Sequence, residues 1–233
     1  MDVVWQGFKE ALRLLFTGDP YVLEVAWLSL KLSGVATFFS LLVGVPAGTL
    51  LALKRFPGRS LLVSLVNTGM GLPPVVVGLF VTVTLWRSGP LGFLELLYSP
   101  SAIVIAQFVI AVPILTGLTM SALQQIDPKL HTQLVGIGAS PMQLVWTLLL
   151  EARMPMLAAV IAGFGAVISE VGAVMMVGGN IIGHTRVLTT ATVLETRKGA
   201  FDVAIALSII LLALTFLVTW FLTSLQQRGS RKQ

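Results

Sequence analysis

The chain has 233 residues, of which 56% are hydrophobic and only 11% are charged, and its formal net charge is +5. A soluble domain typically has about a quarter of its residues charged, so this sequence has too little polar surface to cover a core in water. It contains no cysteine, which excludes disulfides, thiolate catalysis and cysteine-bound metals. We therefore expect an all-α polytopic membrane protein.

Long charge-free windows predict five transmembrane helices. Asp, Glu, Lys and Arg are absent from residues 32–53, 60–86, 96–126 and 203–227, and a fifth window, 154–177, is broken only by Glu170. Each window exceeds the roughly 20 residues that cross a bilayer as a helix. The expected helices cover about 22–53, 60–86, 101–123, 156–177 and 201–225.

The distribution of charge predicts the orientation in the membrane. With five crossings, the loops on one side carry eight basic and two acidic residues, and those on the other carry six basic and seven acidic residues. Because basic residues gather in cytoplasmic loops, we expect the N-terminus outside and the C-terminus in the cytoplasm of a cytoplasmic (inner) membrane. The basic character then reflects topology, and nucleic acid is not expected as a partner.

The first 20 residues have a different pattern from the rest. Trp5, Phe8, Leu12 and Phe16 recur at helical spacing opposite polar residues, which predicts an amphipathic helix on the outer membrane surface. Residues 21–226 form the transmembrane domain, and 227–233 form a basic cytoplasmic tail.

Two features interrupt the apolar spans. Pro73 and Pro74 stand in the second span, where consecutive prolines remove backbone donors and free the preceding carbonyl groups. Glu170 stands in the fourth span, where a carboxylate must face protein or water. Two interpretations stay open for each: structural packing between helices, or a translocation path or gate that would also include Ser169 and Asn180.

The segment between the third and fourth spans, about 124–156, is long for a connection. Leu130, Leu134 and Ile137 share one helical face, Gly138 ends that helix, and Ser140-Pro141 begins another. An apolar helix in this position either rests on the lipid interface or fills a groove of a partner protein.

The helix–turn–helix around Gly138, Ala139 and Ser140 resembles the coupling loop of the permease subunits of ATP-binding-cassette (ABC) importers. The acidic start of that motif is missing, because residues 132–134 read Thr-Gln-Leu where the family usually has Glu-Ala-Ala. Its later Leu-Pro is also altered, since Leu150 is followed by Glu151. Residues 71–79, 168–181 and 183–191 resemble the tungstate, molybdate and sulfate branch of these permeases, and most closely its tungstate type.

This resemblance implies a type I ABC importer permease fold (MetI-like, ModB-like), with residues 21–226 as the permease domain. The chain would translocate tungstate, or a related oxyanion such as molybdate or sulfate, across the membrane. Implied partners are a second permease copy in a homodimer, cytoplasmic ATP-binding subunits and an extracytoplasmic oxyanion-binding protein. The ATPase would contact Leu134, Gly138, Ala139, Ser140 and Pro141.

The chain itself is not expected to be an enzyme. It has no G-x-x-x-x-G-K-S/T loop for holding ATP phosphates, so hydrolysis would belong to a separate subunit. No cofactor or metal site is expected, because His131 and His184 lack neighbours at ligand spacing. A secondary transporter would show paired ionisable residues or an internal repeat, and an intramembrane enzyme would show a base or metal cluster within the spans. Glu170 alone fits the first of these alternatives.

Overall fold

The computed structural model describes residues 2–230, which form eleven α-helices and one short 3-10 helix, with no strand in that range. The helices are α1 (Asp2–Thr17), α2 (Pro20–Leu53), α3 (Arg59–Met70), α4 (Pro74–Leu85), η1 (Gly92–Leu94), α5 (Pro100–Gln124), α6 (Pro128–Gly136), α7 (Pro141–Glu151), α8 (Arg153–Ile168), α9 (Gly172–Gly178), α10 (Leu188–Arg197) and α11 (Phe201–Ser230). Of the basic tail expected at 227–233, residues 231–233 lie outside the described part.

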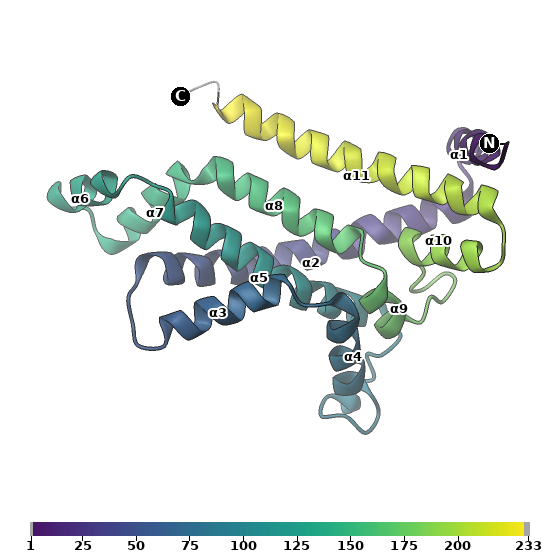
Figure 1. The fold of residues 1–233 in the computed structure, drawn as a ribbon, viewed down its shortest axis with the longest axis horizontal. Coiled ribbons are helices and arrows are strands. Elements are labelled where there is room, and N and C mark those ends of the chain that lie inside the picture. The colour runs from purple at the N-terminus through teal and green to yellow at the C-terminus, as the bar shows by residue number, and fades with distance from the viewer. Residues whose placement is uncertain (1, 231–233) are drawn as a thin grey trace.

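Four helices, α2, α5, α8 and α11, run side by side along the long axis of the molecule (Figure 1). The most extensive pair is α2 with α5, and small residues bring these helices into close contact. A Cβ added at Gly48 of α2 would lie 2.5 Å from the backbone oxygen of Thr116 in α5. Such close backbone approach is the usual way in which membrane helices pack, because lipid provides no hydrophobic drive for their association.

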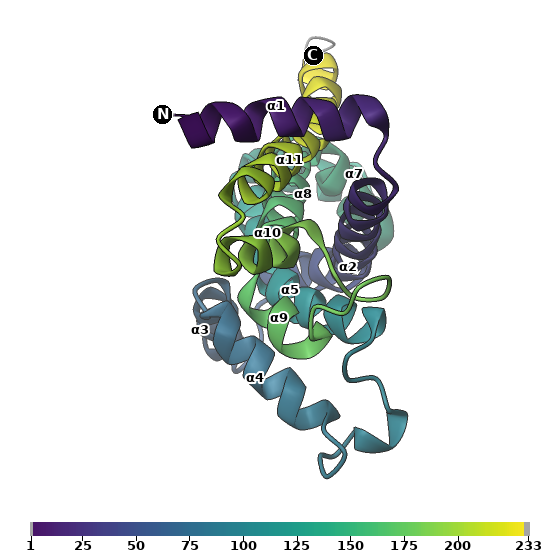
Figure 2. The same cartoon turned by 90° about the vertical axis from the view of Figure 1, so that its right-hand side faces the viewer.

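The two ends of this bundle differ in composition. At one end, the last turns of α2 and α5 pack against α6 and α7, and the nearby α2–α3 turn and start of α6 have the basic residues Lys54, Arg55, Arg59 and Lys129; we call this the basic end. At the opposite end, α10 packs against the first turns of α2 and α11. Helix α1 lies there too and crosses α11 (Figure 2).

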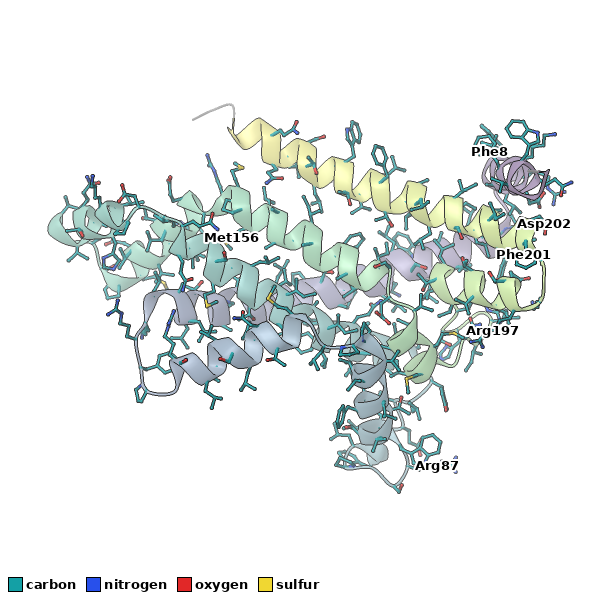
Figure 3. The ribbon with its side chains drawn as sticks, viewed as in Figure 1. Phe8, Arg87, Met156, Arg197, Phe201 and Asp202 are labelled. Atoms are coloured by element: carbon teal, nitrogen blue, oxygen red, sulfur yellow. The ribbon has the colours of Figure 1, made fainter. Side chains whose placement is uncertain are left out.

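Helix α1 presents its small residues to the protein and its large ones outward. Gly7 is buried so closely that a Cβ there would lie 2.5 Å from Ile205 of α11, whereas Trp5 is 58% and Phe16 is 87% exposed. Phe8 lies beside the Phe201–Asp202 start of α11 (Figure 3). The apolar face predicted for this helix is therefore available to a membrane.

Three helices, α2, α5 and α11, are each long and apolar enough to cross a membrane, and up to five spans exist if each of two bent helix pairs counts as one. The helix expected at 60–86 is interrupted at its prolines as predicted, but it is divided into two helices, because α3 and α4 meet at 103°. Pro73 has no N–H and Pro74 occupies the first turn of α4, so the ladder of backbone hydrogen bonds stops there.

The expected continuous helix at 156–177 is wrong. Helix α8 begins at Arg153, bends by 69° from α7, and ends at Ile168. The Ser169 hydroxyl donates to the backbone oxygen of Gly165 at 2.7 Å, a local bond that competes with continued helix. The chain then resumes as the seven-residue helix α9.

Candidate functional site

The two helix breaks meet where α4 crosses α9. A Cβ added at Gly78 of α4 would lie 2.7 Å from the Cα of Ala173, and one added at Gly172 would lie 2.8 Å from the side chain of Val75. The glycines thus permit backbone contact between two short helices that each follow an interruption. Helix α4 leaves the bundle sideways after the bend of 103°, with Arg87 just beyond its far end (Figure 3).

Glu170 lies in the break between α8 and α9, not within a helix. Its side-chain Oε1 accepts the backbone N–H of Ala173 at 2.9 Å, and the residue is 8% exposed. Its backbone oxygen accepts the hydroxyl of Thr189 from α10 at 3.0 Å. Among the side chains that the structure describes, 4–14 and 16–227, no basic group lies within 4 Å of this carboxylate, and its bond to Ala173 caps the first turn of α9.

Gln107 holds the end of α8 from the neighbouring helix α5. Its Nε2 donates to the backbone oxygen of Val167 at 3.0 Å and to the Ser33 hydroxyl at 3.3 Å. The same Val167 oxygen also accepts the backbone N–H of Glu170 at 3.3 Å. Its Oε1 is buried and has no partner among the described residues. The sequence did not identify this role; the available signal was a single amide in a charge-free span.

Asn180 lies beyond α9, in a loop organised by Arg186. The guanidinium donates to the Asn180 side-chain oxygen and backbone oxygen, both at 3.1 Å, and to the Tyr21 hydroxyl at 3.4 Å. Arg186 is only 9% exposed, and Asn180 has a positive φ of 54°. Arg186 was also missed from sequence, where it counted only as an outer-loop charge, whereas His184 is exposed as expected for a loop histidine.

A compact hairpin, residues 128–151, stands at the basic end (Figure 1). Gly138 has a φ of +81°, a left-handed conformation that permits the reversal between α6 and α7. Ser140 forms a capping box with Gln143, each side chain accepting the other's backbone N–H at 3.4 and 2.8 Å. Pro141 occupies the first turn of α7, where its missing N–H is harmless.

The hairpin keeps one apolar face inside and exposes the other. Leu130 and Leu134 pack with Leu148 against the ends of α2 and α5. Ile137 was expected on the face of these leucines, but it is 81% exposed, because it caps α6 and lies in the turn. Large apolar side chains on the outer surface of the hairpin are Val135, Ile137, Met142, Trp146 and Leu150.

The predicted residues therefore form three groups. Pro73 and Pro74 lie in one break and Ser169 and Glu170 in the other, and the crossing of α4 and α9 brings these breaks together. Asn180 is separated from Glu170 by the length of α9. The hairpin residues 134 and 138–141 lie at the far end of the bundle from α9 (Figure 1).

Apolar helices, paired helix breaks and an exposed hairpin are the features expected of the membrane subunit of a transporter. A family model described as "Binding-protein-dependent transport system inner membrane component" matches residues 44–231, and the chain belongs to this family. The expected fold class, an all-α ABC importer permease, is confirmed.

Two curated relatives are similar over most of their length. The tungstate uptake system permease protein of Peptoclostridium acidaminophilum is 37% identical over 227 residues, which cover 97% of this chain and 100% of the relative. A probable anion ABC transporter permease protein of Haloferax volcanii is 40% identical over 199 residues, covering 83% and 86%. The fold is also similar to a chain in the crystal structure of a bacterial alginate ABC transporter in complex with its periplasmic protein, with a TM-score of 0.78, 17% identity and coverage of 97% and 86%.

Proposed function

We propose that the chain is the transmembrane permease subunit of an ABC importer for tungstate or a closely related oxyanion such as molybdate. The observation that carries this proposal is the similarity over the full length to a tungstate uptake permease, supported by the anion permease relative. An oxyanion-binding protein outside the membrane would select the cargo, and a separate ATPase would supply the energy.

The ATPase would grip the hairpin 128–151. Its outer surface exposes Ile137 (81%), Met142 (78%) and Trp146 (63%) at the basic end of the bundle. Exposed large apolar side chains on a compact, well-capped hairpin favour a protein partner with a matching groove. Leu134 would support the hairpin from inside, and Gly138–Pro141 would form the part that enters the ATPase.

A second copy of the chain would complete the membrane unit. Helix α4 stands sideways from the bundle with Leu79 51%, Phe80 69% and Val83 58% exposed. A homodimer would bury these side chains and place two pairs of helix breaks around a central path. We assign Pro73, Pro74, Ser169 and Glu170 to the border of that path.

The membrane orientation follows from the same proposal. The basic end, with the hairpin and the tail 227–233, would face the cytoplasm, and α1 with residues 1–20 would lie on the outer membrane surface. Asn180 and its loop would then lie on the side where the binding protein delivers its cargo. ATP-driven closure of the ATPases would move the two hairpins together and open the path outward, and release of ADP would reset it.

Metal content of cells tests the substrate. In a strain lacking the gene, we expect intracellular tungsten to fall far more than intracellular molybdenum when both oxyanions are supplied, and a plasmid copy should restore it. Equal loss of both metals would contradict a tungstate preference.

Copurification tests the docking of the ATPase. Met142→Glu places a charge on the outer surface of the hairpin, where it should reduce recovery of the ATPase with a tagged chain. Gln125→Glu adds the same charge at an exposed position just before the hairpin and should leave recovery unchanged. Equal recovery with both variants would exclude this surface as the docking site.

A further inference from the structure

A cavity of about 450 Å³ opens at the basic end, between the end of α2, the start of α3, the end of α5 and the start of α6. Leu148 of α7 also lines it. The charge-free window of α2 ends just before Lys54, and that of α5 ends just before Asp127. The cavity therefore lies at the depth where the hydrocarbon of a bilayer gives way to its headgroups.

The charged groups that line this cavity are two arginines and one carboxylate. Arg55, Arg59 and His131 line it together with one acidic residue, Asp127, and the neutral Gln124. The Asp127 carboxylate accepts the backbone N–H of Lys129 at 2.8 Å and so caps α6. Among the side chains described at 4–14 and 16–227, neither arginine has a carboxylate within 4 Å.

The two arginines differ in how they are held. Arg59 donates its Nε–H to the backbone oxygen of Leu51 at 2.7 Å, which fixes the side chain and leaves both terminal nitrogens of the guanidinium for another acceptor. Arg55 is exposed and makes no side-chain hydrogen bond within the described chain. Guanidinium groups bind phosphate oxygens in pairs, and a fixed guanidinium loses less side-chain entropy when it does so.

We propose that this cavity binds the phosphate group of an anionic phospholipid. Basic pockets between transmembrane helices at a membrane surface are suited to acidic headgroups. The walls beside the cations are apolar, with Ala52, Leu53 and Ile126, which suits the glycerol and upper acyl carbons of a lipid more than a free hydrated anion. Because His131 and Leu148 belong to the hairpin 128–151, the bound lipid braces the base of that hairpin.

The test measures lipid retained by the full-length chain in its intact complex, purified into discs containing dioleoylphosphatidylglycerol or dioleoylphosphatidylcholine and analysed by native mass spectrometry. Wild-type protein should retain phosphatidylglycerol in preference to phosphatidylcholine. Arg55→Gln should weaken retention of phosphatidylglycerol by about fivefold, and Arg55→Gln with Arg59→Gln by about 30-fold. Lys54→Gln removes the same charge from the adjacent residue, which does not line the cavity, and should change retention by less than about twofold.

Three results would overturn the proposal. Equal effects of Lys54→Gln and Arg55→Gln would mean that the lipid responds to diffuse surface charge. Equal retention of the two lipids would mean that the cavity does not distinguish an anionic from a zwitterionic headgroup. Displacement of phosphatidylglycerol by millimolar inorganic phosphate would mean that the cavity is a site for free anions. Arg59→Lys is the control for misfolding, because it changes the same residue but keeps its charge. It should retain more lipid than Arg59→Gln.

Discussion

Gly78→Ala is the substitution that most directly tests the crossing of the two broken helices. The added Cβ would lie 2.7 Å from the Cα of Ala173 and 3.2 Å from the sulfur of Met176. The sulfur can rotate away, but the Cα belongs to the backbone of α9. Helix α4 must therefore shift from α9, and the two breaks must separate.

The expected loss of stability follows from two opposing terms. Forcing an extra carbon into a packed contact costs about 1–3 kcal/mol. Alanine gains about 0.5–1 kcal/mol over glycine within a helix, which offsets part of that cost. At the midpoints of these ranges the net loss is about 1.2 kcal/mol, which corresponds to an unfolding temperature lower by about 2–5 °C for a chain of this size.

The assay is thermal unfolding of the purified permease together with uptake by cells. Gly34→Ala in α2 is the matched control, because outside the neighbouring turns of its own helix no atom lies within 4 Å of the added carbon. The control should be as stable as wild type or slightly more stable, with normal uptake, whereas Gly78→Ala should lose both stability and uptake. If the two variants unfold at the same temperature and transport equally, the close contact of α4 with α9 is not part of the working structure.

Three further substitutions test the remaining parts of the site. Glu170→Ala should lower stability in thermal unfolding by about 0.5–2 kcal/mol, because it removes the cap of α9. Glu170→Gln keeps a hydrogen-bond acceptor and should cost less. If Glu170→Gln lost uptake at unchanged stability, the negative charge of Glu170 would instead have a role in the translocation path. Arg186→Met should lower stability by about 1–3 kcal/mol, because Asn180 and Tyr21 lose the guanidinium that donates to them. If Arg186→Lys were as stable as wild type, the paired donors of the guanidinium would not be required. Gly138 and Gly58 have left-handed backbones, with φ of +81° and +84°, and an added Cβ would meet open space at both. Gly138→Ala and Gly58→Ala should therefore each cost about 1–2 kcal/mol through backbone strain alone. Only Gly138→Ala should reduce recovery of the ATPase, and an equal reduction in both variants would mean that general strain is responsible.

The uninterrupted spans could be predicted from sequence, and the broken ones only in part. Helices α2, α5 and α11 each cover all or most of a charge-free window. In lipid a single apolar segment satisfies its own backbone hydrogen bonds by forming a helix, so these windows predict helices. Pro73 and Pro74 predict an interruption, but the direction of α4 after it depends on its contact with α9. The end of α8 at Ile168 has no local proline, and the amide of Gln107, from a different helix, donates to the backbone oxygen of Val167 there.

The buried polar residues show where sequence patterns lose information. A count of the charges in loops treats all loop residues as solvated, so it places Arg186 in water. The burial of Arg186 depends on the left-handed conformation of Asn180 and on Tyr21, which is 165 positions away in the chain. By contrast, Gly138 and Ser140 identify the hairpin turn because a positive φ and a capping box are properties of adjacent residues.

ATP-dependent uptake in reconstituted vesicles is the most direct test of a permease driven through its hairpin by a separate ATPase. Vesicles would contain this chain with its ATPase, the binding protein would be supplied outside, and entry of tungstate would be measured with and without ATP inside. We expect uptake only when the ATPase, ATP and the binding protein are all present, and we expect it to be lost in Met142→Glu vesicles. Uptake of tungstate by vesicles that contain this chain alone would contradict the account and would indicate a secondary transporter.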